Sequence, residues 1–295
     1  MGKTTLALSL ARRFRGEIIN ADSRQVYRLM DIGTAKPTLE ERAQAQHHLL
    51  DIRDPGDNFS LACFLSLAKR AIGSAQDRGH LPVAVGGTGQ YIWALLEGWE
   101  VPEVAPDIAF REAKQREAQQ HGPLFVHRRL AEIDPDRAAA LDPRNLRRVV
   151  RALEIYHSTQ RRPSDLAKQA RPMTGALVIG LTLDREALYR RIDERVDRMM
   201  AAGFLEEVQR LADHGCEPGR GPLAGPGYRE LGQYLAGQMT LAEAVQRTKF
   251  QTHRLARRQY TWFKLDDPRI KWLAAEGAGL EERAAALVEK FLSAI

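Results

Sequence analysis

The chain alternates short apolar segments with longer amphipathic ones, and this alternation constrains its fold more than any other feature. Residues 17–21 and 81–85 are short apolar segments that predict strands, and residues 60–76 between them have the spacing of a helix. A further strand-like segment, 177–183, precedes a predicted helix over 186–200. Strands that alternate with helices form parallel sheets covered by helices. The sequence therefore predicts an α/β fold.

The stretch from residue 106 to residue 172 interrupts this alternation. It contains no strand-like segment, and prolines separate its helix-like runs. We interpret it as an all-helical insertion. The expected organisation is a core domain over 1–105 and 177–295 and a helical domain over 106–176. The C-terminal third also has helical periodicity, broken by a loop rich in glycine and proline at 217–227.

A glycine, a lysine and a threonine precede the first predicted helix, which covers residues 6–14. Gly2, Lys3 and Thr4 have the order of the last residues of a P-loop. In such a loop, backbone amides, the lysine and the helix N-terminus hold phosphate oxygens, and the hydroxyl reaches Mg²⁺. The preceding strand and first glycine are not in the sequence, so we expect the chain to begin inside the loop, through a misplaced start or as a fragment. A charged N-terminus without a role is the alternative.

Polar and glycine residues follow the first two predicted strands. Asp22 ends the first, and Gly86-Gly87-Thr88-Gly89 follows the second. Open α/β sheets bind their ligands at the carboxyl ends of strands. Asp22 is therefore the candidate general base, with a capping or turn aspartate as the alternative. The glycines allow a ligand to approach the backbone and Thr88 presents a hydroxyl, although a plain strand-to-helix turn is also possible.

Basic residues are concentrated in two regions. The chain has 44 Lys and Arg against 38 Asp and Glu, a net charge of +6. Residues 244–264 contain six Lys or Arg and no acid, and residues 144–171 contain eight against two acids. Aromatic residues Tyr260, Trp262 and Phe263 lie at the end of the first region. Cations neutralise phosphates and flat rings stack on bases, so this pattern predicts a nucleic-acid partner. A solvated helix face is the alternative.

The composition also indicates a cellular compartment. Two cysteines are too few for a disulfide framework, and no apolar run approaches the roughly 18 residues of a membrane span. The first residues do not resemble a secretory signal. We therefore expect a cytoplasmic protein with no membrane partner, and we predict a monomer.

Several motifs make the sequence similar to a known family. In chain order they are Asn20-Ala21-Asp22-Ser23-Arg24-Gln25-Val26-Tyr27, Met30-Asp31-Ile32-Gly33-Thr34-Ala35-Lys36-Pro37, Val85-Gly86-Gly87-Thr88-Gly89, Arg147-Arg148-Val149-Val150-Arg151 and Arg257-Arg258-Gln259-Tyr260-Thr261-Trp262-Phe263. Together they resemble the tRNA dimethylallyltransferases, also called tRNA isopentenyltransferases, from Gly2 to about Trp272. The resemblance implies a nucleotide-kinase-like P-loop core with a helical insertion. It also implies transfer of a dimethylallyl group from dimethylallyl diphosphate to N6 of adenine 37, beside the anticodon of tRNA.

The resemblance implies roles for individual residues. Asp22 would accept a proton from the adenine N6 amino group, and Thr88 would contact the target nucleotide. The P-loop would hold the diphosphate with Mg²⁺ instead of ATP, through Gly2, Lys3, Thr4 and Thr5, with Thr4 as the metal ligand. The residues assigned to the anticodon stem-loop are Asp22, Ser23, Arg24, Gln25, Arg111, Arg147, Arg148, Val149, Val150, Arg151, Gly227, Tyr228, Arg229, Arg257, Arg258, Gln259, Tyr260, Thr261, Trp262, Phe263 and Lys264.

Three alternatives stay open at this point. A prenyltransferase that acts on free adenine nucleotides shares the core, but does not need two basic regions. A small-molecule P-loop kinase fits Gly2-Lys3-Thr4, but not the run from Asp22 to Tyr27. An RNA-binding remnant, inactive because its P-loop is incomplete, would bind tRNA without transferring a prenyl group.

Overall fold

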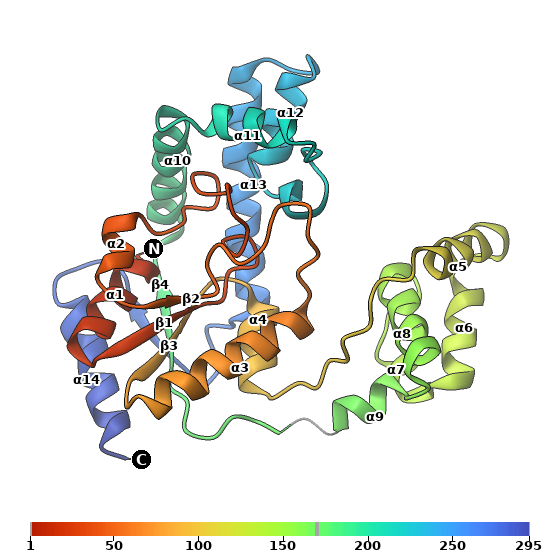
Figure 1. Cartoon of the computed structure of the whole chain (residues 1–295), viewed down its shortest axis with the longest axis horizontal. Coiled ribbons are helices and arrows are strands. Elements are labelled where there is room, and N and C mark those ends of the chain that lie inside the picture. Colours follow the sequence, from red (N-terminus) through yellow and green to blue (C-terminus); the bar gives the residue numbers. More distant parts are fainter. Residues whose placement is uncertain (1, 169–170, 295) are drawn as a thin grey trace. The chain divides into compact units, whose positions relative to one another are not determined.

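The chain divides into two compact units (Figure 1). The computed structural model describes residues 2–168 and 171–294. The core unit comprises residues 1–93 and 174–295, and the helical unit comprises residues 94–173. The strands found among the described residues all belong to the core unit, and helices cover them. The predicted α/β class with a parallel sheet and a helical insertion is therefore confirmed.

The strands of the core unit form two parallel groups. β1 (Gly16–Asn20) lies between β2 (His47–His48) and β3 (Leu81–Val85), and β4 (Val178–Thr182) pairs with β5 (Ile270–Ala274). Within the described residues, β3 and β4 each pair with a strand on one edge only. Accordingly β1 is buried over most of its length, whereas β3 is half-buried. β1 is the well-covered strand that leads into the turn with Asp22.

Helices pack on both groups of strands. Those of the core unit are α1 (Lys3–Arg13), α2 (Leu39–Ala43), α3 (Leu61–Asp77), α4 (Gly89–Leu96, which continues into the helical unit), α10 (Arg185–Ala201), α11 (Phe204–Asp213), the 3₁₀ turn η1 (Gly221–Ala224), α12 (Tyr228–Leu235), α13 (Leu241–Trp262) and α14 (Leu280–Leu292). Side-chain caps fix several of their starts. Ser60 accepts the backbone N–H of Cys63 at 3.1 Å, and Thr240 forms a capping box with Glu243 at the start of α13.

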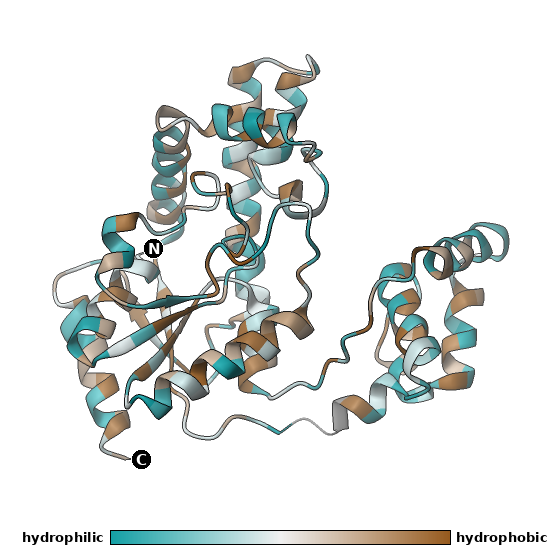
Figure 2. Cartoon of the chain, in the orientation of Figure 1, coloured by the Kyte–Doolittle hydropathy of each residue, from teal (hydrophilic) through white to brown (hydrophobic). Residues whose placement is uncertain are grey.

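The helical unit has its own apolar core. Its helices are α5 (Ile108–His121), α6 (Pro123–Ile133), α7 (Pro135–Ala139), α8 (Leu146–Thr159) and α9 (Pro163–Lys168). Val126 and Leu130 of α6 pack with Val149 and Leu153 of α8 in its centre. α5 is hydrophilic along most of its length (Figure 2). An amphipathic helix set with its own core is the expected form of a compact insertion.

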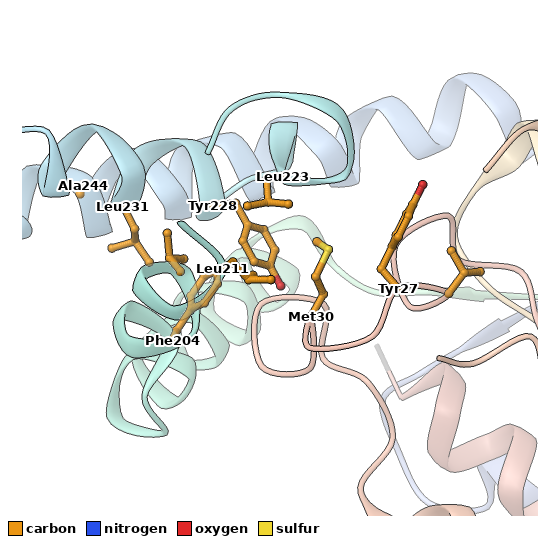
Figure 3. Close-up of a cluster of buried hydrophobic side chains, with 10 residues drawn as sticks. Tyr27, Met30, Phe204, Leu211, Leu223, Tyr228, Leu231 and Ala244 are labelled. Atoms are coloured by element: carbon orange, nitrogen blue, oxygen red, sulfur yellow. The ribbon is translucent and has the colours of Figure 1, made fainter. Parts of the chain in front are cut away.

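The core unit has an apolar cluster that holds the loop after β1 against α11 and α12. Figure 3 shows Met30 of that loop beside Tyr228, in the buried cluster that also contains Phe204. The rings of Phe204 and Tyr228 meet edge to face, with centroids 5.1 Å apart. This packing fixes the segment that carries the motif residues 30–37.

Two strands differ from the sequence expectation. β2 is a pair of histidines, which has no apolar signal, and β5 lies in the C-terminal third that we expected to be helical. β5 has only five residues, and of these only Ile270 is fully buried. None of the helices within residues 2–168 and 171–294 combines the length and the apolar character needed to cross a bilayer.

Candidate active site

Asp22 lies two residues beyond the end of β1, in a turn that its own hydrogen bonds stabilise. Its backbone N–H donates to the side-chain oxygen of Asn20 at 3.0 Å, and its Oδ1 accepts the backbone N–H of Arg24 at 2.9 Å. Asn20 also donates to the carbonyl oxygen of Leu49 at 3.0 Å. The turn therefore uses one carboxylate oxygen of Asp22, and the carboxylate has a second oxygen that can accept a proton.

The glycine loop after β3 packs against the end of β1. The N–H of Ala21 donates to the last carbonyl of β3 at 2.7 Å. A Cβ added to Gly86 would lie 2.2 Å from the carbonyl oxygen of Ala21, so only glycine allows this approach. The N–H of Ser23 donates to Thr88 Oγ1 at 3.2 Å. Asp22 and Thr88 are thus carried by adjacent turns at the same edge of the sheet.

Lys3, the first residue of α1, lies close enough to Asp22 for the two charges to interact. Gly2 before it has a φ of 75°, a conformation that favours glycine. Burial lowers the pKa of the Lys3 ammonium below its ordinary value of 10.5; the charge of Asp22 opposes this shift, and the charge of Arg195 adds to it. The Arg195 guanidinium and the Lys3 ammonium are close enough to interact, and together they favour an anionic ligand.

Arg195 is a candidate that the motifs do not reveal. It lies on α10, four residues after Arg191, so the two guanidinium groups belong to the same side of the helix. Arg191, Gly2 and Thr5 line a cavity of about 370 Å³ beside the start of α1. The spacing of the two arginines is their only sequence signal, and many solvated helices have the same spacing.

Thr4 is the predicted Mg²⁺ ligand. Its side chain is half-buried in the first turn of α1. Across the part of the chain that the structure describes, no group of three or more His, Cys, Asp or Glu side chains could hold a metal ion. Mg²⁺ commonly keeps several waters and binds one or two protein oxygens together with substrate phosphates. A single hydroxyl at the start of α1 fits a metal that arrives with a diphosphate.

The motif over residues 30–37 stabilises the loop that follows Asp22. Lys36 is 8% exposed, and its ammonium donates to the carbonyl oxygen of Tyr27 at 2.7 Å and to Asp51 at 2.6 Å. It also pairs with Asp31. These three acceptors satisfy the three donors of a buried ammonium. Lys36 therefore has a structural role in the site.

Glu207 of α11 is a buried carboxylate that joins this motif to α12. It is 2% exposed and accepts the backbone N–H groups of Asp31, Ile32 and Gly33 at 2.9, 2.7 and 3.1 Å. It also accepts the hydroxyl of Tyr228 at 2.7 Å. Burial and the Glu207 charge raise the pKa of the Tyr228 hydroxyl, which therefore stays protonated as a donor.

A match to a protein-family model identifies the family of the chain. The model described as IPP transferase matches residues 25–266. The chain belongs to the IPP transferase family. It is 48% identical over 294 residues to the tRNA dimethylallyltransferase of Roseiflexus sp. (strain RS-1), covering 100% of this chain and 96% of that protein. It is 47% identical to the tRNA dimethylallyltransferase of Thermomicrobium roseum, covering 99% and 88%.

Solved structures of the IPP transferase family have the same fold. The tRNA isopentenylpyrophosphate transferase from Bacillus halodurans is 37% identical with a TM-score of 0.70, over 99% of this chain and 94% of that one. A eukaryotic dimethylallyltransferase acting on tRNA is 29% identical with a TM-score of 0.85, over 99% and 77%. The predicted family is confirmed.

The residues assigned to tRNA next to Asp22 differ in what their side chains contact. Burial lowers the pKa of the Arg24 guanidinium; the charge of Asp22 opposes the shift, and Arg258 adds to it. Gln25 donates through Nε2 to two carbonyls of the motif loop, at 3.0 and 3.1 Å. Arg24 is thus held among charged neighbours, whereas the Gln25 amide supports the loop.

The residues assigned to tRNA at the start of α12 form part of its capping. The N–H of Gly227 donates to Glu230 at 2.8 Å, and Arg229 donates to the same carboxylate at 2.8 and 3.0 Å. Tyr228 is 1% exposed, so its ring belongs to the apolar cluster around Phe204. Of these residues, only Arg229 has a substantially exposed side chain.

The end of α13 is the more exposed of the predicted RNA surfaces in the core unit. The side chains that face solvent are those of Arg257, Arg258, Thr261, Trp262 and Lys264, whereas Gln259, Tyr260 and Phe263 are half-buried. The indole N–H of Trp93 donates to the carbonyl oxygen of Trp262 at 2.7 Å. The last turn of α13 is therefore anchored to α4 while its cations remain accessible.

In the helical unit, only part of the predicted RNA set faces solvent. Arg147 and Arg148 are exposed, whereas Val149 and Val150 are buried in the core of the unit. Arg111 and Arg151 both donate to the fully buried carboxylate of Glu154. Arg111 does so through two bonds of 2.8 Å. The two valine side chains therefore contact protein, and the two arginines neutralise Glu154.

Proposed function

We propose that the chain transfers a dimethylallyl group from dimethylallyl diphosphate to N6 of adenine 37 in tRNA. The observation that carries this proposal is the meeting of a carboxylate, a hydroxyl and an ammonium at one sheet edge, in a chain of the IPP transferase family. Asp22, Thr88 and Lys3 are the groups concerned. They supply a proton acceptor, a nucleotide contact and an anion site, which are the three functions that the reaction needs.

Asp22 is the proposed general base. The lone pair of adenine N6 is delocalised into the ring, so the amino group is a weak nucleophile. A carboxylate within hydrogen-bond reach orients the amino group and accepts its proton as the new N–C bond forms. The bond between the allylic carbon and the diphosphate oxygen breaks in the same reaction. We assign to Thr88, whose hydroxyl accepts the N–H of Ser23, a contact with the same nucleotide.

Lys3 and its neighbours are the proposed binding site of the donor. Lys3, Thr4 and Thr5 lie in the first turn of α1, where the helix N-terminus adds backbone N–H donors. We include Arg195 because its charge acts on Lys3. These cations stabilise the negative charge that develops on the leaving diphosphate. Bound Mg²⁺, with Thr4 as its protein ligand, would add further positive charge there.

The anticodon stem-loop is the proposed RNA substrate. The exposed arginines at the end of α13 and the start of α8 supply cations for its phosphates. Adenine 37 must leave the loop stack to reach Asp22. A base without a Watson–Crick partner does this at a cost of only a few kcal/mol. We expect the chain to act as a monomer.

Incubation of the purified chain with Mg²⁺, labelled dimethylallyl diphosphate and RNA tests the proposal. The RNA substrates are an anticodon stem-loop with adenine at position 37 and a matched one with guanine there, and AMP is the third acceptor. We expect label in N6-dimethylallyladenosine from the adenine stem-loop alone. Label in AMP but not in RNA would instead identify an enzyme of free nucleotides. Tight RNA binding without any transfer would identify an inactive binding protein.

A further inference from the structure

Gln259 lies among the residues assigned to tRNA, yet its side chain contacts the glycine loop. It is in the last turn of α13, and its Nε2 donates to the carbonyl oxygen of Gly87 at 3.1 Å. A Cβ added to Gly87 would lie 2.4 Å from this nitrogen. The Gln259 amide therefore fills the space beside Gly87, and it is half-buried there while Arg257 and Arg258 before it face solvent.

Gly87 is also next to the ammonium group of the donor site. The same added Cβ would lie 3.7 Å from Lys3 Nζ. Gly87 thus has Gln259 and Lys3 as close neighbours, and the residue after it, Thr88, accepts the N–H of Ser23. A shift of Gly87 would therefore disturb both the surroundings of the Lys3 ammonium and the position of Thr88, and the Gln259 amide opposes such a shift by pairing the Gly87 carbonyl.

A second contact fixes the same turn of α13 on the loop. A Cβ added to Gly89 would lie 2.3 Å from Cγ of Trp262, so the indole packs directly on the glycine. Trp93 of α4 holds the backbone of Trp262 through its indole N–H. With the helix turn anchored in this way, the Gln259 side chain reaches Gly87 from a rigid position, which is the condition for orienting a catalytic loop.

We propose that Gln259 is a positioning residue for the glycine loop and does not act as an RNA contact. It holds the Gly87 carbonyl so that the Thr88 hydroxyl keeps its hydrogen bond to Ser23 and the loop backbone keeps its position beside the Lys3 ammonium. This proposal rests on the proposed function, because it assumes that Lys3 binds the donor.

Two variants and a matched control separate positioning from RNA contact. Gln259→Leu removes the donor, and Gln259→Glu keeps the size but places a carboxylate against the Gly87 carbonyl. Gln246→Leu, at an exposed position of the same helix, is the control. We expect both Gln259 variants to weaken binding of Mg-pyrophosphate by roughly 3- to 10-fold, the effect of one lost hydrogen bond. We expect the Kd for the anticodon stem-loop to stay within about twofold.

The results of this experiment can be distinguished from those that test the proposed function. A weaker stem-loop Kd with unchanged pyrophosphate binding would make Gln259 an RNA contact, and no change in either Kd would remove it from both roles. Full pyrophosphate binding by Gln259→Glu but not by Gln259→Leu would reduce its role to packing. If the wild-type chain transfers no prenyl group, the proposed function fails, while the two Kd values still decide the role of Gln259. Thermal melting, matched to Gln246→Leu, identifies a variant that has lost its fold.

Discussion

The backbone N–H of Ser23 donates to the hydroxyl oxygen of Thr88 at 3.2 Å, across 65 residues of sequence. This bond joins the turn after β1 to the loop after β3, so a shift of either turn moves the other. The Asp22 carboxylate precedes Ser23 and the Gly87 carbonyl precedes Thr88. The acid and the glycine loop are therefore one structural unit, although they come from different strands.

Asp22→Asn tests the general base without destroying the turn. Asparagine keeps a side-chain oxygen that can accept the N–H of Arg24, but it cannot accept a proton from adenine N6. We expect turnover to fall on the order of 10²–10⁴-fold, while the melting temperature and the stem-loop Kd hold steady. Single-turnover assays with saturating RNA measure the effect. Wild-type turnover in this variant would exclude Asp22 as the base.

The lowered pKa of Lys3 predicts how donor binding depends on pH. Burial favours the neutral amine in the free protein, so the ammonium is lost at a lower pH than the ordinary value of 10.5. A bound anion favours the charged form, so binding of pyrophosphate should be accompanied by proton uptake and weaken as the pH rises through the lowered pKa. Titrations from pH 7 to pH 10 check this. Lys3→Arg should lose the pH dependence, since arginine stays charged, and an unchanged profile in that variant would contradict the assignment.

Arg257 and Arg258 predict a change in the salt dependence of RNA binding. Both side chains are exposed at the end of α13. If each neutralises one phosphate, alanine at either position should lower the slope of log K against log salt by about one unit. Filter binding of the stem-loop at several salt concentrations measures the slope. Lys290→Ala, at an exposed position of α14, is the control. An unchanged slope for Arg257→Ala and Arg258→Ala would show that this face does not bind RNA.

The strands that position the site could be predicted from the sequence, because each is short, has an apolar centre and ends next to polar or glycine residues. β1, β3 and β4 lie within one residue of their predicted ends. Asp22 and Thr88 follow from the strands, since parallel strands bring their carboxyl ends to one edge. β5 is missed although four of its five residues are apolar, because a short segment next to the long helix α13 is interpreted as part of a helical C-terminal third.

The supporting residues could not be predicted, because their signal is not local. Glu207 accepts an N–H from Asp31, which lies 176 residues earlier. A glutamate on an amphipathic helix usually faces solvent, so nothing in the sequence of α11 marks this one as buried. Val149 and Val150 show the converse. They lie between exposed Arg148 and half-buried Arg151 in a basic motif, and the periodicity of α8 places both valines in the core of the helical unit.

Glu207 and Tyr228 should depend on each other for their contribution to stability. Tyr228→Phe removes one bond to Glu207 and should cost about 1–2 kcal/mol of unfolding free energy. Glu207→Gln places an amide N–H₂ group against backbone N–H donors, and should cost about 2–4 kcal/mol. Because both changes alter the same bond between Tyr228 and Glu207, the double variant should cost less than the sum. Urea unfolding measures all three, and strict additivity would disprove the coupling.

Glu17 predicts a loss of stability at acidic pH. This buried residue of β1 accepts hydrogen bonds from Arg78 at 2.7 and 2.9 Å, and its oxygens lie 2.6 Å from ring nitrogens of both His48 and His80. The bonds from Arg78 are the main cause that lowers the pKa of Glu17 to about 2, against the effect of burial. A carboxylate with a lowered folded-state pKa stabilises the fold above its unfolded value of 4.5. That contribution is lost as the pH falls from 4.5 towards 2.

Glu17→Gln isolates this contribution. At pH 7 we expect the variant to be less stable by on the order of 2 kcal/mol, because it leaves the Arg78 guanidinium without its carboxylate. The difference between wild type and variant should shrink as the pH falls below 4.5, since the wild type loses the same interaction by protonation. Urea unfolding at pH 7, 5 and 3.5 measures the difference. Glu132→Gln, at an exposed position of α6, should show almost none at any of these values. A difference that stays constant with pH would mean that Glu17 acts through its shape and not through its charge.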